Sequence, residues 1–265
     1  RHYLSCSVIA GEGDDMQRDD WYSSMRDAAD LAPAAAIGDY AARRSLARLG
    51  ARRLKTRKVP VIFEAPLAAG LLGSLVHAAS GGALYRKSSF LLDHLGKRVM
   101  PEFIQICERP HIKCGLGSAS FDSDGVATRD RDIVTDGILQ SYFLSTYTAR
   151  KLGMQTTGNA GGSHNLIIQP GQLDLDGLLA AMGTGLFVTE LLGHGINYVT
   201  GDYSRGAAGY WVENGRIAYP VEEITIAGNL KAMLAGVVAV GNDVQVRGSK
   251  QTGSILLNRM TVAGE

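Results

Sequence analysis

Short stretches rich in β-branched and aromatic residues recur along the chain, with turn signals between them. Residues 59–65 (VPVIFEA), 103–110 (FIQICERP) and 254–264 (SILLNRMTVAG) have this composition and predict buried strands. Residues 4–24 predict a strand, a polar turn and a second extended segment that ends in aromatic residues. The pattern therefore indicates many short strands.

Two dipeptides predict tight hairpins. Asp136-Gly137 lies between two β-rich runs in residues 132–145, and Asn214-Gly215 lies within residues 209–221. Both dipeptides favour the positive φ angles that a two-residue hairpin turn requires. Successive hairpins produce antiparallel sheet.

A helix is predicted over residues 33–55, after Pro33. Its spacing places apolar residues on one face and arginines on another. The basic stripe fits either a nucleic-acid patch or, more simply, a solvated face that acids elsewhere offset. The apolar face consists of Ala42, Leu46 and Leu49, and the basic stripe consists of Arg44, Arg48 and Arg52.

A segment without formal charge lies between Glu64 and Arg86 and is rich in Ala and Gly. Its length would fit a bilayer, but it has few large apolar side chains and is interrupted by polar residues. We therefore expect residues 66–84 to form a buried, closely packed helix, in which Gly73→Leu would overpack the surroundings. His77 is the only histidine in this segment.

Further helices are predicted between the strands. Residues 146–153 end at Gly153, a C-cap residue, and residues 174–183 begin at Asp174, an N-cap residue. Residues 229–242 fit a helix or a helix followed by a strand. The predicted fold class is α+β, with a largely antiparallel sheet built from hairpins and with interspersed helices.

Composition narrows the possible partners. The 265 residues are 45% hydrophobic and carry a net charge of +1, from 27 basic and 26 acidic side chains. This balance gives no overall field that would attract nucleic acid or anionic lipid. Cys6, Cys107 and Cys114 form no CxxC motif, which favours reduced thiols in the cytoplasm.

Common catalytic motifs are missing. No two of the six histidines are four residues apart, so the HExxH pattern of zinc hydrolases does not occur. His111 and Cys114 are too few for a metal site, and His77 is better explained as a hydrogen-bonded core or interface residue. Adjacent Ser163 and His164 are a weak candidate for a nucleophile and its base, because sequence neighbours need not face each other.

Residues 191–215 combine six glycines with aromatic and charged side chains. Asp202 and Arg205 are close enough to pair across a glycine bend, and Trp211 offers a wide, stiff surface. These features fit either a peptide or partner groove or simply sheet edges with aromatic cross-strand pairs. Asp202, Arg205 and Trp211 are the candidate peptide or partner contacts.

Four long phrases resemble the PmbA (TldE) branch of the TldD/PmbA family, and they cover nearly the whole chain. They are MQRDDWYSS (16–24), the run from FEAPLAAG to LDHLGK (63–97), the run from GVATRDRD to SHNLI (125–167) and the run from NYVTGDYS to IAGNL (197–230). Family members are longer, so residues 1–265 resemble their C-terminal region, without the N-terminal α/β domain.

The resemblance implies a cytoplasmic bacterial protease system that processes peptides or small unfolded proteins. In this system a TldD-type zinc metallopeptidase, with a histidine pair on a helix and a cysteine near the C-terminus, partners a PmbA-type subunit in a heterodimer. The family is also linked by name to DNA gyrase modulation. The resemblance thus implies a TldD-like partner, and a homodimer is plausible in its absence.

The sequence departs from the TldD pattern at the expected metal helix. Residues 66–80 contain only His77 where two histidines and a glutamate would stand, and Thr252 occupies the region where a thiol would be sought. One imidazole cannot hold Zn²⁺ tightly enough for hydrolysis. We therefore expect no catalytic residue, metal or cofactor in this chain, with zinc in the partner.

The expected function is that of a substrate-holding subunit in a zinc metallopeptidase complex. Two alternatives stay open. One is a binding protein that modulates DNA gyrase without protease activity. The other is a self-sufficient hydrolase with unrecognised chemistry, for example through Ser163 and His164. Membrane association and direct nucleic-acid binding are not expected.

Overall fold

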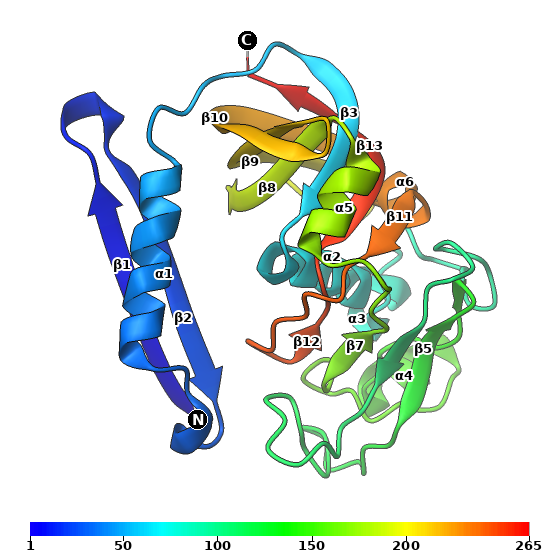
Figure 1. Ribbon diagram of the computed structural model, residues 1–265. Coiled ribbons are helices and arrows are strands. Elements are labelled where there is room, and N and C mark those ends of the chain that lie inside the picture. Colours follow the sequence, from blue (N-terminus) through cyan, green and yellow to red (C-terminus); the bar gives the residue numbers. More distant parts are fainter. Residues whose placement is uncertain (265) are drawn as a thin grey trace.

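The computed structural model describes residues 1–264 and begins with a hairpin–helix unit. Strands β1 (His2–Ala10) and β2 (Gln17–Met25) pair in antiparallel register, and α1 (Ala34–Ala47) packs against both. Helix α1 buries Ile37, Ala41 and Ser45, and the Ser45 hydroxyl donates to the Val8 carbonyl. The unit lies on the left in Figure 1, beside the larger body of the molecule.

The larger body contains a closed ring of strands. Each of five strands pairs with two others in the order β10-β9-β8-β3-β13, and β13 pairs with β10 again. Within this ring only the β3–β8 pair is parallel, and β11 (Val237–Val240) extends the sheet beyond β13. We call this ring the barrel; its strands are β3 (Arg57–Phe63), β8 (Gly185–Leu192), β9 (Asp202–Glu213), β10 (Arg216–Asn229) and β13 (Ile255–Ala263).

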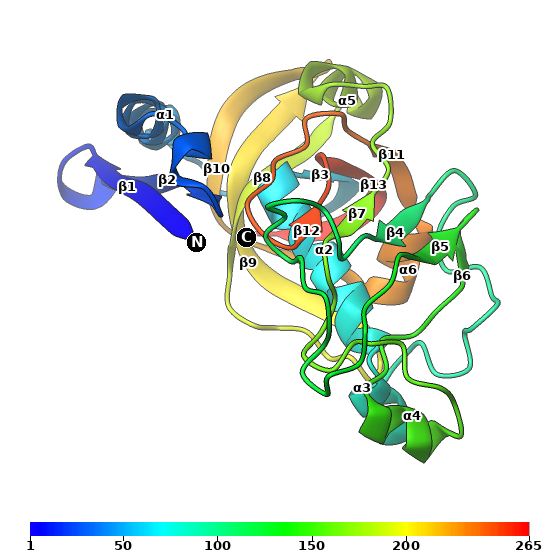
Figure 2. The same cartoon turned by 90° about the horizontal axis from the view of Figure 1, so that it is seen from below.

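Helix α2 (Ala65–Ala78) follows β3 directly and packs one face into the barrel core. Leu71, Leu72 and Leu75 belong to the same buried cluster as Phe63 and Trp211 of the barrel strands. Seen from below, α2 runs beside the curved strands β8, β9 and β10 (Figure 2). The sequence pattern explains this position, because an uncharged helix is stable only where apolar surface surrounds it.

A second, five-stranded sheet has the order β12-β7-β4-β5-β6. Glu108 is almost fully buried there and receives hydrogen bonds from Arg131, from Asn159 and from the His164 amide. This satisfied network fixes the loops around the sheet. The strands are β4 (Ile106–Glu108), β5 (Arg131–Thr135), β6 (Ile138–Leu139), β7 (Leu166–Ile168) and β12 (Lys250–Gln251).

Short helices complete the fold. Helix α5 (Leu175–Met182) packs on the outer face of the barrel through Leu178, Leu179 and Met182. The others are α3 (Gly81–Tyr85), α4 (Thr146–Leu152), α6 (Leu230–Ala235) and the 3-10 turns Gly13–Asp15 and Ala28–Asp30. No helix within residues 1–264 combines the length and apolar character that crossing a membrane demands.

The predicted fold class is confirmed, because the structure is α+β with mainly antiparallel pairing. Both predicted hairpin turns form, with positive φ at Asp136, Gly137, Asn214 and Gly215. The Gly153 and Asp174 caps also form as predicted. Residues 229–242 are a helix followed by a strand, which settles the alternative left open by the sequence.

Several sequence predictions are wrong in detail. Helix α1 ends at Ala47 and not near residue 55, and Leu46 is 58% exposed although its spacing predicted a buried face. The small-residue helix is interrupted before Gly81, where Ser80 caps the new helix α3. Gly73 does not face the core, because a Cβ there would meet only side-chain carbons of Lys250, at 3.7 and 4.0 Å; overpacking by the larger Gly73→Leu side chain stays a prediction.

Candidate functional site

A charged cluster joins the hairpin–helix unit to the barrel. Arg44 of α1 forms a two-point hydrogen bond with Glu64, the residue between β3 and α2, at 2.6 and 3.1 Å. Arg44 Nε also lies 3.2 Å from an oxygen of Asp19 on β2, though it is not aligned for a hydrogen bond. Arg48 pairs with Glu190 of β8 at 2.5 Å. Four separate segments, namely α1, β2, the β3–α2 junction and β8, therefore meet through these ion pairs.

Both interpretations of the basic stripe are wrong for Arg44 and Arg48. Their side chains are 12% and 10% exposed and are paired with acids, so neither is free to bind nucleic acid or to be solvated. Only Arg52 is exposed, and its guanidinium lies over the Tyr219 ring. Arg44 and Arg48 face the barrel, whereas Arg52 lies beyond the end of α1.

Burial and pairing compete in this cluster. Burial by itself would lower the pKa of Arg44, but Glu64 and Asp19 raise this pKa above its ordinary value. Burial raises the pKa of the Glu64 carboxyl, and Arg44 offsets that increase only in part. The balance is expected where two carboxylates share one guanidinium out of reach of water.

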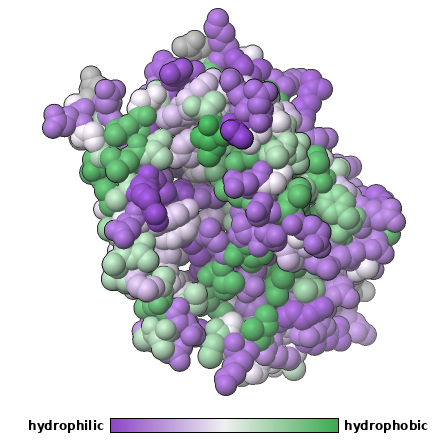
Figure 3. Space-filling model, in the orientation of Figure 1, coloured by the Kyte–Doolittle hydropathy of each residue, from purple (hydrophilic) through white to green (hydrophobic). Residues whose placement is uncertain are grey.

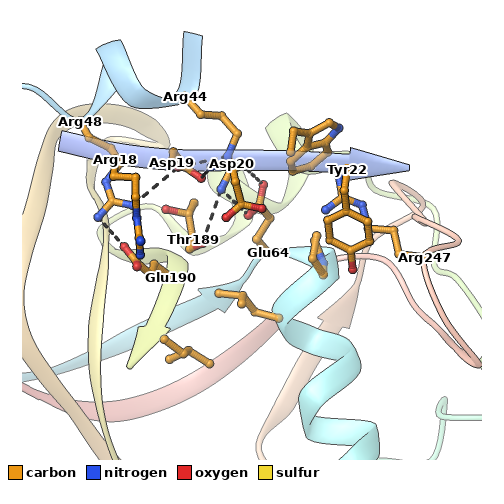
Figure 4. A pocket seen from close by; sticks show the side chains of 14 residues that line it. Arg18, Asp19, Asp20, Tyr22, Arg44, Arg48, Glu64, Thr189, Glu190 and Arg247 are labelled. Carbon is orange, nitrogen blue, oxygen red and sulfur yellow. Dashed lines mark hydrogen bonds and ion pairs between the residues drawn. The ribbon is translucent and has the colours of Figure 1, made fainter. Parts of the chain in front are cut away.

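A cavity of about 290 Å³ lies beside the cluster, between β2, the end of β8 and the start of α2 (Figure 4). We call it the seam cavity. Arg247 reaches it from the loop between β11 and β12, with its guanidinium carbon 3.3 Å from the centre of the Trp21 ring and 4.4 Å from that of Tyr22. Thr189 lines the same cavity, and its hydroxyl is buried without a hydrogen-bond partner within the described residues.

A more apolar pocket of about 480 Å³ lies on the other side of the Arg44–Glu64 pair. Tyr40, Phe187, Tyr210 and Tyr219 line it, and it shares Thr189 with the seam cavity. Hydrophobic and hydrophilic residues are interspersed on the face of the molecule in Figure 3. Both pockets lie at the junction of α1 with the barrel.

The three residues proposed from sequence do not form one network. Asp202 is exposed and bonds to Thr200 and Asn229, whereas Arg205 donates to the Leu191 carbonyl. The expected Asp202–Arg205 ion pair is wrong: none joins them in the described structure.

Trp211 lies in the barrel core with 3% of its surface exposed. Its indole N–H donates to Glu213, and the Arg57 guanidinium covers the ring. On the same strand, burial raises the pKa of Tyr203 to about 12, although Arg205 lowers it in part. Trp211 therefore stabilises the barrel, and a contact role for Asp202, Arg205 and Trp211 stays a prediction.

The candidate metal ligands considered from the sequence do not form a zinc site. His77 is exposed and stacks on Tyr198 with a centroid separation of 3.9 Å, so the core interpretation of His77 is wrong while the interface one stays open. His111 contacts Thr128, and Thr252 is buried with its hydroxyl on the Gly253 carbonyl. Across residues 1–264, no three His, Cys, Asp or Glu side chains are grouped as a metal site requires.

The Ser163–His164 pair lacks the geometry of a nucleophile and its base. His164 Nε2 lies 3.2 Å from the Gly158 carbonyl oxygen, and the His164 amide donates to Glu108. No hydrogen bond between Ser163 and His164 occurs in the described part of the chain. The buried loop network thus accounts for His164.

Sequence reasoning missed the cluster of Asp19, Arg44, Glu64, Arg48 and Glu190. One signal was available: Glu64 is a single charge between a buried strand and an uncharged helix. A lone acid in such a run requires a partner. Which arginine supplies that partner depends on the tertiary structure.

Comparison with protein families shows the family to which the chain belongs. A profile described as the PmbA/TldA metallopeptidase C-terminal domain matches residues 56–264, and the corresponding central-domain profile matches residues 1–49. The chain belongs to the PmbA/TldA metallopeptidase family. The boundary between the two matches coincides with the segment that joins the hairpin–helix unit to the barrel.

Curated relatives place the chain in the PmbA branch, C-terminal region. It is 54% identical to Metalloprotease PmbA of Escherichia coli O157:H7 over 265 residues, which is all of this chain and 59% of that protein. It is 51% identical to a PmbA homolog of Haemophilus influenzae, again over 59% of the relative. The chain therefore spans about three-fifths of the length of these relatives.

Solved structures share the fold. A proposed modulator of DNA gyrase from Bacteroides thetaiotaomicron is similar with a TM-score of 0.93 and 33% identity, over 99% of this chain and 60% of that one. TldE from Thermococcus kodakarensis, at 23% identity, shows the fold alone, with a TM-score of 0.85 over 99% of this chain and 62% of that one.

Proposed function

We propose that this chain is the substrate-holding subunit of a cytoplasmic zinc metallopeptidase complex. A TldD-like partner would hold the zinc and cleave peptides or small unfolded proteins, while this chain would bind no metal or cofactor and would complete the substrate chamber. Membership in a metallopeptidase family supports the general activity.

This proposal rests mainly on the small number of possible zinc ligands on α2. The helix that follows β3 carries a single imidazole, His77, which stacks on Tyr198. Peptidase zinc sites need three protein ligands and an open position for water. This chain belongs to a metallopeptidase family but has too few zinc ligands on α2. The simplest explanation is that a second subunit binds the zinc and this chain binds the substrate.

The contact residues are proposed on strand β9 and its approach. Asp202 is exposed at the start of β9, and Arg205 is half-buried three residues later. Both lie where a peptide or the partner subunit could pair with polar groups of the barrel. The same surface would serve a homodimer when the partner is absent.

Reconstitution with the TldD-like partner tests the proposal. The double variant Asp202→Ala/Arg205→Ala should process an unfolded peptide substrate more slowly than wild type. Arg53→Ala/Glu223→Ala removes an exposed ion pair and is the matched control, with wild-type processing expected. Both variants should first show wild-type melting temperatures. Equal processing by all three proteins would contradict the assigned contacts.

A gyrase-binding role is the second candidate, because two structural neighbours, from Bacteroides thetaiotaomicron and Thermotoga maritima, are described as proposed modulators of DNA gyrase. Retention of gyrase, but not of a TldD-like subunit, on immobilised chain would favour it. The net charge of +1 gives no support to direct DNA contact. Hydrolysis by the purified chain alone, abolished by Ser163→Ala, would instead favour a self-sufficient enzyme.

A further inference from the structure

The loop between β11 and β12 is fixed to the larger body of the molecule at both ends. At its start, the Asp243 carboxylate accepts hydrogen bonds from the amide and the hydroxyl of Ser254, next to β13. At its end, the Ser249 carbonyl accepts from the Leu166 amide, and β12 pairs with β7 directly afterwards. Between these anchors lie residues 244–248, which we call the strap.

The strap is attached to the hairpin–helix unit through the side chain of Arg247. Its guanidinium carbon lies 3.3 Å from the centre of the Trp21 ring and 4.4 Å from that of Tyr22. In the described part of the chain, no backbone hydrogen bond involves residues 244–248, and a Cβ at Gly248 would meet nothing within 4 Å. The position of the strap therefore depends mainly on this stacking.

The aromatic surface under Arg247 is held independently of the strap. The centre of the Trp21 ring lies 4.3 Å from that of Tyr40 on α1, and the Arg44 guanidinium lies 4.9 Å from it. Arg44 is in turn held by its ion pair with Glu64. Contacts within the junction therefore keep Trp21 in place whether or not Arg247 is stacked on it.

The stacked position of Arg247 is only modestly favoured. No carboxylate within the described residues forms an ion pair with this guanidinium. Burial lowers the pKa of Arg247, and Tyr22 and Glu64 offset this only in part. Because loss of hydration opposes the attraction of the rings, the stacking favours the closed position by a factor of about 2–30. A contact of this strength can be released and formed again.

The two ends of the seam cavity are held by contacts of different kinds (Figure 4). At one end Arg48 forms an ion pair with Glu190 at 2.5 Å. At the other end the Arg247 guanidinium lies against Tyr22 without an ion pair in the described structure. Separating a buried ion pair costs more than separating a stacked pair, so the Arg247 end is the one that opens.

We propose that the strap is a gate at the Tyr22 end of the seam cavity, closed when Arg247 stacks on Trp21 and Tyr22 and open when this stacking is released. The strap swings between its anchors at Asp243 and Ser249, while the ion pairs of the junction keep the hairpin–helix unit attached. Opening uncovers Trp21 and gives solutes access to the cavity from this end. The gate goes beyond the proposed function and holds whether or not this chain contacts a substrate.

Acrylamide quenching of tryptophan fluorescence in the full chain tests the gate, because it measures how easily a small neutral molecule reaches the indole rings. The chain has two tryptophans, and Trp211 is 3% exposed, so quenching reports mainly on Trp21. Arg247→Gln should raise the Stern–Volmer constant, because it removes the cation that covers Trp21. Arg53→Gln changes an exposed arginine elsewhere and is the control, with the wild-type constant expected.

Thermolysin cleavage within the strap measures the open population directly. The enzyme cleaves before apolar residues, and the strap contains Val244 and Val246. Cleavage of a native protein follows the population of its open form when opening and closing are fast. Arg247→Gln should therefore speed cleavage about 2–30-fold, the factor that the stacking contributes. Arg247→Lys should give an intermediate rate, because an ammonium lacks the planar group that stacks on a ring.

A double variant separates the stacking from general loosening of the fold. Trp21→Leu should speed strap cleavage as Arg247→Gln does, and the two changes together should add nothing, because both remove the same contact. Each variant should first show a wild-type melting temperature, and Arg247→Lys takes the place of Arg247→Gln if the latter does not fold. Unchanged quenching, unchanged cleavage, or effects that multiply in the double variant would each overturn the inference.

Discussion

At the scale of single residues, the junction depends on the buried pair of Arg44 and Glu64. The two side chains are 12% and 9% exposed, and Asp19 approaches the same guanidinium. Removal of one partner would leave a buried charge without compensation, which costs more than the pair itself contributes. The pair is thus best regarded as a fixed junction between the hairpin–helix unit and the barrel.

We expect Arg44→Ala to lower the free energy of unfolding by about 3–5 kcal/mol, because Glu64 and Asp19 would lose their shared cation. Arg43→Ala, at the neighbouring exposed position, is the control and should stay within about 0.5 kcal/mol of wild type. Urea denaturation measures both values. If Arg44→Ala lowered the free energy of unfolding no more than Arg43→Ala does, the buried pair would not stabilise the junction.

The sequence predicted the role of a residue correctly where that role depends only on neighbouring residues in the chain. The caps at Gly153 and Asp174 were predictable because they involve only neighbouring backbone. The partners of Arg44 were not, since Asp19 and Glu64 come from other elements. Spacing placed Arg44 and Arg48 on one side of the helix, but no local rule could tell that they face the barrel.

At the scale of elements, α2 has two different faces. Ala68 is fully buried, whereas Gly73 faces Lys250 with room for a Cβ. Composition predicted the burial of the helix but could not orient it, because small residues occur all around it. The overpacking expected for Gly73→Leu therefore stays a prediction.

Matched substitutions on α2 test this orientation. Gly73→Ala should stabilise the protein by about 0.5–1 kcal/mol, because it restricts the unfolded chain and meets no obstacle. Ala68→Leu should destabilise by about 1–3 kcal/mol through overpacking. Thermal melting monitored by circular dichroism compares them. A reversed order of the two effects would mean that the helix is rotated.

The Asp136–Gly137 turn gives a second test at this scale. Gly137 has φ +73°, and a Cβ there would collide with the carbonyl oxygens of Met100 and Pro101. Gly125 has φ +77° but open space around it. Replacing Gly125 with Ala therefore measures the cost of the backbone strain without a collision. Gly125→Ala should cost about 1–2 kcal/mol and Gly137→Ala clearly more. If urea denaturation showed the same loss of unfolding free energy for both variants, the collision at Gly137 would contribute nothing.

Hairpins were the elements that the sequence predicted best, since two residues largely determine a turn. The closure of β10 onto β13 and the parallel β3–β8 pair were not predictable from local pattern. Both pairings join segments far apart in the chain.

At the scale of the whole molecule, the long phrases in the sequence identified the family, and the family profiles confirm it. The seam cavity could not be predicted, because it lies between a hairpin and a barrel that meet only in the folded chain. The division of labour proposed here likewise depends on a partner subunit and follows from the donors that α2 lacks.

The most direct test of this account is the zinc content of the purified chain, alone and co-purified with its TldD-like partner, measured by elemental analysis. We predict background zinc in the isolated chain and zinc in the complex, since one imidazole on α2 cannot hold the ion. Tightly bound, stoichiometric zinc in the isolated chain, with proteolysis that a chelator stops, would contradict the account.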